Sequence, residues 1–235
     1  MFANWGCILS EEKISQMLGE HYSRAFALHG QKPEGVDWGP EPDDHKIRLD
    51  RMLAVTELGT PKVRTTLLDV GCGFGSLLDL IHERDMAVDY HGIDLCVSMI
   101  KAAQSKYPDA QWLVGDILKT DIPEKYDYVV CNGILTQKLG ASISEMDEFA
   151  KALISKMFKL CEIGIAFNLM TTHVNFMVPN LFYRNPVELL GWCMTELTPR
   201  VRLDHAYPLF EYTLYLYRED APGLVYGSHR RSKAE

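Results

Sequence analysis

A glycine-rich turn is the part of this sequence whose residue types best suit ligand chemistry. Residues 67–75 read LLDVGCGFG, so an apolar run reaches Asp69 and is followed by Gly71, Gly73 and Gly75. Glycine has no side chain, so a ligand can lie directly against backbone N–H groups where a helix begins. The pattern predicts a strand, a tight turn and a helix that together bind a nucleoside-type cofactor.

The spacing of the glycines distinguishes between two kinds of cofactor. A dinucleotide site favours G-x-G-x-x-G, whereas here Ser76 stands three places after Gly73. The D-x-G-x-G-x-G arrangement instead resembles motif I of class I S-adenosylmethionine-dependent methyltransferases. The resemblance implies a Rossmann-like α/β fold and S-adenosyl-L-methionine as the cofactor, with the turn beside its methionine and ribose portions.

Acidic residues end the next two predicted strands as well. Asp94 lies 25 residues after Asp69, where a carboxylate at a strand end can accept hydrogen bonds from both ribose hydroxyls. The resemblance implies that Asp116, with Ile117 beside it, contacts the adenine. Three strand ends therefore agree on one site. The cofactor residues predicted for this half are Asp94, Leu95, Met99, Asp116 and Ile117.

The fourth predicted strand, YDYVVCNG, ends in Cys131, Asn132 and Gly133. The resemblance places this strand end beside the methionine portion of the cofactor and the transferred methyl group, so Asn132 and Gly133 are assigned to cofactor binding. Asn132 is also assigned to the reaction centre. The segment departs from the D/N-P-P-Y motif of the subgroup that methylates nucleobases or glutamine amides. Cys131 is interpreted as a packing residue rather than a nucleophile.

The N-terminal segment resembles the helical lid of bacterial small-molecule members of this family. Apolar residues recur at helical spacing from Glu11 to Leu28, and a second helix is predicted near Asp44 to Leu58. Tyr22, Trp38 and Arg48 are assigned to the cofactor. Trp38 offers a π face to the sulfonium, or is plain core. Arg48 pairs with the cofactor carboxylate, or lies on a solvated helix face.

Four residues near the C-terminus are candidates for the acceptor side of the site. His173, just after the GIAFNLM run, is the first candidate for a general base, and His205 is the second. Tyr183 and Tyr207 are candidates to bind the substrate. Each of the four has an ordinary structural role as its alternative. A base is optional, because methyl transfer from a sulfonium depends mainly on positioning and desolvation.

Short apolar runs alternate with helical patterns from Val63 onward, which predicts βαβ units and a mainly parallel sheet. Two β-like runs at the end, VRLDHAY and FEYTLYLYR, predict an antiparallel hairpin. The expected fold is therefore a doubly wound, Rossmann-like α/β domain with seven strands. The expected division is a lid over residues 1–58, the S-adenosylmethionine-binding domain over 59–220 and a tail over 221–235.

Composition narrows the classes of partner. A net charge of -8 disfavours nucleic acid, whose binding depends on lysine and arginine contacts. The six cysteines form no CxxC pair, so neither a metal site nor a disulfide framework is predicted. No apolar run approaches the roughly 20 residues of a membrane span. We expect a cytoplasmic monomer or homodimer whose partner is a small-molecule acceptor.

The leading functional hypothesis is methyl transfer to oxygen or nitrogen of a small polar metabolite, which releases S-adenosylhomocysteine. Three alternatives stay open from the sequence. The first is intramolecular cyclisation of S-adenosylmethionine to azetidine-2-carboxylate and methylthioadenosine. The second is a non-catalytic subunit that binds the adenosyl compound, and the third is a nicotinamide-dependent reductase.

Overall fold

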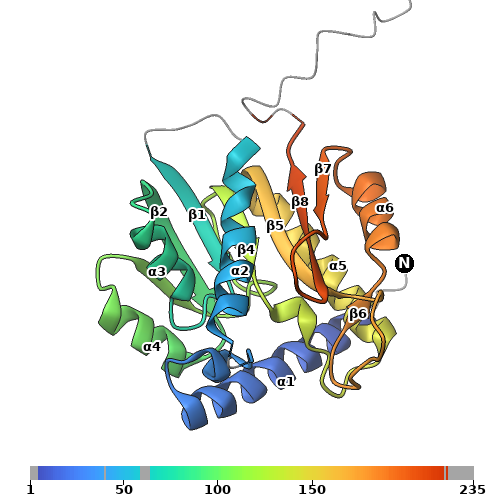
Figure 1. Ribbon diagram of the computed structural model, residues 1–235, viewed down its shortest axis with the longest axis horizontal. Helices are drawn as coiled ribbons and strands as arrows, with labels where there is room; N and C mark the ends of the chain where they lie inside the picture. The colour runs from blue at the N-terminus through green and yellow to red at the C-terminus, as the bar shows by residue number, and fades with distance from the viewer. Residues whose placement is uncertain (1–4, 40, 59–63, 220, 222–235) are drawn as a thin grey trace, which may run out of the picture.

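A mixed β-sheet forms the centre of the protein, with helices on both faces (Figure 1). The computed structural model describes residues 5–39, 41–58, 64–219 and 221. The strands are β1 (Thr65–Val70), β2 (Val88–Asp94), β3 (Gln111–Val114), β4 (Tyr126–Cys131), β5 (Cys161–Thr171), β6 (Tyr183–Arg184), β7 (Val201–Asp204) and β8 (Glu211–Tyr217). The helices are α1 (Trp5–His29), α2 (Pro42–Leu53), α3 (Ser76–Glu83), α4 (Val97–Lys106), α5 (Ile143–Leu160) and α6 (Pro186–Glu196).

The strand order is β3-β2-β1-β4-β5-β8-β7, and β6 pairs with β5 outside this path. Strands β1 to β5 are parallel, whereas β8 is antiparallel to both β5 and β7. The predicted doubly wound sheet with a C-terminal antiparallel hairpin is confirmed. The eighth strand, β6, is an addition to the seven predicted, because two residues leave no periodic pattern in a sequence.

Burial of the strands explains their apolar sequences. Every residue of β4 and of β8 is buried, as expected for strands covered on both faces. Neighbouring side chains alternate between the two sides of the sheet. Leu67 packs in the hydrophobic cluster that includes α2 and α3, while Leu68 packs in the cluster that includes α5 and α6. Helix α1 lies across the end of the sheet at which the parallel strands have their C-termini (Figure 1).

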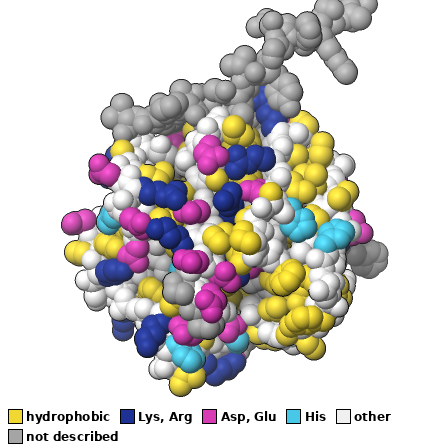
Figure 2. Space-filling model, viewed as in Figure 1, with side chains coloured by type: hydrophobic (Ala, Val, Ile, Leu, Met, Phe, Trp, Pro, Cys, Tyr) yellow, Lys and Arg dark blue, Asp and Glu magenta, His cyan; other side chains and the backbone are white. Residues whose placement is uncertain are grey.

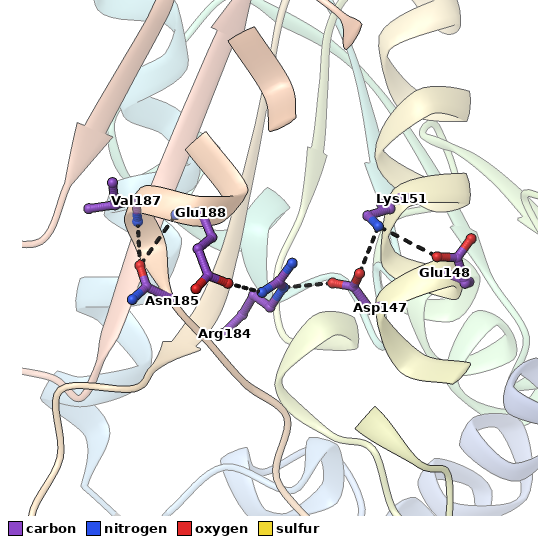
Figure 3. Close-up of polar contacts among 7 residues, drawn as sticks. All are labelled: Asp147, Glu148, Lys151, Arg184, Asn185, Val187 and Glu188. Carbon is purple, nitrogen blue, oxygen red and sulfur yellow. Dashed lines mark hydrogen bonds and ion pairs between the residues drawn. The ribbon is translucent and has the colours of Figure 1, made fainter. Parts of the chain in front are cut away.

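Capping residues in the sequence fix where helices α5 and α6 begin. Helix α5 begins at Ile143, after the cap residue Ser142, which exchanges two hydrogen bonds with Glu145 in a capping box. Helix α6 begins at Pro186, after the cap residue Asn185, whose side chain accepts hydrogen bonds from two backbone N–H groups of the first turn. The two helices are tied by Arg184, whose Nε donates to Oδ1 of Asp147 on α5 at 2.6 Å (Figure 3).

The N-terminal helices differ in their bounds from the prediction. Helix α1 runs from Trp5 to His29, and α2 ends at Leu53, after which a 3-10 helix spans Ala54–Leu58. The predicted boundary at residue 59 falls in the segment 59–63, outside the described residues, as does the predicted tail apart from Ala221. Both domain limits remain proposals.

Helix α2 and the 3-10 helix after it are fastened to β8, which lies between β5 and the edge strand β7. The hydroxyl of Tyr215 donates to the carbonyl of Arg51 at 2.9 Å, and that of Tyr217 donates to the carbonyl of Val55 at 3.2 Å. Met52 is buried in the same hydrophobic cluster as these two tyrosines and the apolar residues of α3. Because every residue of β8 is buried, α2 is a fixed layer of the domain.

A buried ion pair completes this attachment. Nε and Nη2 of Arg48 on α2 both donate to Oε1 of Glu211 on β8, at 2.8 and 2.6 Å. The side chains are 11% and 2% exposed. The other carboxylate oxygen of Glu211 accepts Nδ2 of Asn168 at 2.7 Å, and Oδ1 of Asn168 accepts the N–H of Gly133 at 2.9 Å. This chain of contacts links α2 to the end of β4.

We expect Glu211→Gln to destabilise the fold by about 3 to 5 kcal/mol, because it leaves the Arg48 charge buried without a counter-charge. The measurement is the free energy of unfolding in urea. The matched control is Glu188→Gln, which breaks the pair of Arg184 with a 64% exposed partner and should cost about 0 to 1 kcal/mol. Equal losses in the two variants would contradict this view of the buried pair.

Candidate active site

A cavity lies where the parallel strands end, enclosed by α1 on one side and by α2 on another. It contains about 1010 Å³ of space, its open mouth included. Most residues predicted to bind the cofactor meet here. They are Tyr22, Trp38, Asp69, Gly71, Gly73, Asp94, Leu95, Met99, Asp116, Ile117, Asn132 and Gly133.

Asp94 holds the glycine turn in place. Its Oδ2 accepts the N–H of Gly73 at 2.8 Å, and its Oδ1 accepts the N–H of Cys96 at 2.7 Å. Burial raises the pKa of Asp94, and the backbone hydrogen bonds oppose that rise. Each carboxylate oxygen has a second lone pair. The group can therefore shape the turn and still accept hydroxyl protons from a ligand.

Asp69 is buried at the end of β1 and accepts a hydrogen bond from the hydroxyl of Tyr90 at 2.7 Å. Its pKa is raised to about 7, mainly by burial; the Tyr90 hydrogen bond opposes the rise and the nearby Asp94 adds to it. A cation bound beside Asp69 would favour the ionised carboxylate.

The end of the cavity at β3 is apolar. Asp116 accepts the N–H of Leu118 through Oδ1 at 2.9 Å, and Ile117 is buried beside it. The walls here include Leu18 from α1 and Phe149 from α5, neither of which is among the residues predicted from the sequence. Apolar side chains beside one acidic residue suit a purine ring.

The end of the cavity at β4 carries an unpaired acceptor. Oδ1 of Asn132 is buried and has no hydrogen-bond partner in the described structure. Gly133 has φ +91°, and a Cβ there would lie 2.6 Å from Cζ2 of Trp38, so glycine permits both the turn and the contact with the lid. Cys131 is buried and its pKa is raised by burial, in agreement with a packing role.

Helix α2 adds one polar residue that the sequence reasoning missed. His45 lines the cavity, and its Nδ1 is buried without a hydrogen-bond partner. Its pKa is lowered to about 4, first by burial and then by the guanidinium of Arg48, while Asp79 opposes the shift. The imidazole is therefore neutral at pH 7. The sequence around it, PDDHKIR, reads as a solvated helix, and only the packing of α2 on α3 turns this position inward.

The donor set of the cavity fits S-adenosylmethionine. The cofactor carries a sulfonium, an ammonium, a carboxylate and two ribose hydroxyls. Acidic side chains that line the cavity suit the cations and the hydroxyls, and the two orphaned polar atoms, Asn132 Oδ1 and His45 Nδ1, need the partners that a polar ligand supplies.

Two predicted cofactor residues are placed differently. Arg48 does not line the cavity, because its guanidinium is bound to Glu211 and stacks 4.0 Å from the ring centroid of Trp38. One face of Trp38 is therefore already covered by a cation. Gly75 also lies outside the lining, and a Cβ at this position would lie 2.9 Å from Cη2 of Trp112. Glycine at position 75 therefore allows the start of α3 to pack closely on Trp112 of β3.

The predicted acceptor residues are not brought to the cavity. His173 and His205 are exposed, and their rings are 6.1 Å apart on the loops after β5 and β7. The hydroxyl of Tyr183 accepts the N–H of Val178 at 3.1 Å, while Tyr207 is buried beside Thr213. The reason is the length of β5, which continues to Thr171 and carries its loop away from the strand ends that line the cavity.

We expect Asp94→Ala to weaken binding of S-adenosylhomocysteine by about 10- to 100-fold, because a charged acceptor of hydroxyl protons is lost and the glycine turn is loosened. Isothermal titration calorimetry measures this. Asp89→Ala is the matched control, since Asp89 lies at the opposite end of β2 and its partner Arg64 is exposed. Unchanged affinity in Asp94→Ala would remove Asp94 from the site.

The raised pKa of Asp69 has a consequence for stability. The native protein keeps this proton up to about pH 7, whereas the unfolded chain loses it near the ordinary value of about 3.9. The native state therefore binds more protons between about pH 4 and 7, and its stability falls as the pH rises through that window, by at most about 1.4 kcal/mol per pH unit.

We expect Asp69→Asn to remove this pH dependence. The stability difference between variant and wild type should shift in favour of the variant from pH 5 to pH 7, as measured by urea unfolding without ligand. Asp89→Asn serves as the exposed control. If the stability curves of Asp69→Asn and wild type run parallel across this range, the buried carboxyl does not have the assigned pKa.

The comparisons with known proteins agree with this geometry. A family model described as "Methyltransferase domain" matches residues 67–153. The methyltransferase-family protein Rv1506c of Mycobacterium tuberculosis is 30% identical over 148 residues, which cover 62% of this chain and 89% of that protein. Trans-aconitate 2-methyltransferase of Escherichia coli O157:H7 is 36% identical over 101 residues, which cover 42% of this chain and only 40% of that enzyme.

A solved structure shares the fold. CalS10 with bound S-adenosylmethionine, an amino pentose methyltransferase from Micromonospora echinaspora, matches with a TM-score of 0.55 at 16% identity, over 75% of this chain and 90% of that chain. The match to Rv1506c extends over most of that protein, and the family model spans the glycine turn and three strand ends of the cavity. The chain therefore belongs to the class I S-adenosylmethionine-dependent methyltransferases.

Proposed function

We propose that this enzyme transfers the methyl group of S-adenosylmethionine to oxygen or nitrogen of a small molecule. The observation that carries the proposal is that α1 and α2 line the cavity and cover part of it above the strand ends. A macromolecular side chain reaches such a site only through an open groove, whereas a small molecule can be enclosed. Enclosure also excludes water, which favours displacement at a sulfonium.

The surface supports a small-molecule acceptor. On the face seen in Figure 2, acidic and basic side chains of the described residues are interspersed rather than gathered in a basic patch. Several form pairs across α2 and α3, such as Lys46 with Glu83 at 2.7 Å. Nucleic-acid binding depends on a continuous basic surface, and this face offers none among the residues described.

The charge of the cavity favours an uncharged or amine-bearing acceptor. Among the described residues that line it, the charged side chains are acidic, and none is lysine or arginine. A polycarboxylate such as trans-aconitate would have no strong counter-charge there. The acceptor is therefore proposed to differ in charge from the substrate that names the Escherichia coli relative.

The bound cofactor supplies an activated methyl group, because its sulfur leaves as a neutral thioether. The protein then has to orient the reactants and to exclude water. We propose that Asn132 orients the reactants through its free Oδ1, which can accept a hydrogen bond from the acceptor or from the cofactor. Trp38, packed on Gly133, excludes water.

The test is product analysis by mass spectrometry after incubation with S-adenosylmethionine and a panel of alcohols, phenols, amines and carboxylic acids. We expect S-adenosylhomocysteine and a product heavier by one methylene unit with neutral or amine acceptors. Methylthioadenosine formed without an acceptor would identify cofactor cyclisation instead. Binding without turnover on any member of the panel, or transfer confined to carboxylic acids, would contradict the proposal.

The same assay separates the candidate residues. Asn132→Ala should lower kcat by about tenfold or more, because an orienting contact at the reaction centre is lost, and His173→Ala should leave kcat within about twofold of wild type. Both proteins are first checked for unchanged unfolding midpoints. A large loss in His173→Ala alone would restore that residue as the base.

A further inference from the structure

The cavity has a marked asymmetry of charge. Acidic side chains from the ends of β1, β2 and β3 line it, but among the described lining residues the single basic side chain is His45 of α2. S-adenosylmethionine brings two positive groups and one carboxylate. The positive groups have acidic partners within reach, whereas the carboxylate requires a donor from the remaining wall.

The position of His45 matches the end of the cavity where this carboxylate must lie. The adenosine portion is assigned to Asp94 and Asp116 at the ends of β2 and β3, so the methionine tail extends toward β1 and β4. Helix α2 covers that end, and it contributes His45 and Leu49 to the lining. The imidazole lies beside Trp38, with 6.4 Å between ring centroids, and Trp38 in turn contacts Gly133.

The other basic residue of this helix face is not available. Arg48 donates both Nε and Nη2 to Glu211, so its charge is already paired. His45 instead has a buried Nδ1 with no partner. A buried polar atom without a hydrogen bond destabilises a protein unless a ligand or water satisfies it. His45 therefore has an unpaired nitrogen in a cavity whose described lining contains no lysine or arginine.

We propose that His45 binds the α-carboxylate of the cofactor's methionine portion through Nδ1. The charged groups that act on the imidazole are Arg48 on its own helix and Asp79 on α3. In the ligand-free protein, burial and the Arg48 guanidinium outweigh Asp79, so the His45 ring is neutral. A bound carboxylate adds a negative neighbour, which favours protonation of the ring. The proposal concerns the cofactor alone and is independent of the acceptor.

Two ligands that differ only in the tail test this role by calorimetry. S-adenosylhomocysteine carries the amino acid tail, whereas 5′-methylthioadenosine ends in a methylthio group. We expect His45→Leu to weaken the binding of S-adenosylhomocysteine by about tenfold or more and to change the affinity for methylthioadenosine by less than about twofold. His45→Asn, which keeps a donor near the position of Nδ1, should recover part of the loss.

Asp94→Ala is the comparison variant, because the loss of a ribose contact should weaken the binding of both ligands alike. Unchanged affinity of His45→Leu for S-adenosylhomocysteine would overturn the proposal, and so would an equal loss for both ligands. Histidine ring signals in NMR spectra of the wild-type protein give a second measurement. The pKa of His45 should rise with S-adenosylhomocysteine but not with methylthioadenosine, and the absence of that difference would also overturn the proposal.

Discussion

The contact between the Asp94 carboxylate and the N–H of Gly73 sets the geometry on which the rest of the site depends. It joins the end of β2 to the turn after β1, so two neighbouring strands and the start of α3 are held at one distance. The buried carboxylate tolerates this position because backbone N–H groups offset its desolvation. The cavity floor is thus built before any ligand arrives, and the lid helices only have to cover it.

The sequence predicts the residues of that floor because their chemistry is local. Glycine spacing, a strand end and an acidic residue lie within a few positions of one another, as at Asp69 and Asp94. The alternation of strands and helices likewise follows from short-range periodicity, and the antiparallel hairpin follows from a connection too short for a helix. These features do not require knowledge of which distant segments meet.

Residues whose roles depend on distant contacts were not predictable in the same way. Arg48 reads as free to bind an anion until Glu211, far along the chain, is found beside it. His45 reads as solvated until α2 is packed on α3. His173 follows a strand end in the sequence, but the extra length of β5 takes it to the surface. In each case one long-range contact reverses the role that residue type and local spacing indicate.

Helix α2 and the segment after α1 are held to the domain by different kinds of polar contact. Helix α2 is bound by a buried ion pair and by the hydroxyls of Tyr215 and Tyr217. The segment after α1 is held by Asp37, whose partly exposed carboxylate accepts from Gln137 at 2.7 Å and pairs with His21 at 2.9 Å. Solvated contacts of this kind break at a lower free energy than buried ones. The segment between α1 and α2 can therefore separate from the loop after β4 at a lower free energy than α2 can leave the sheet.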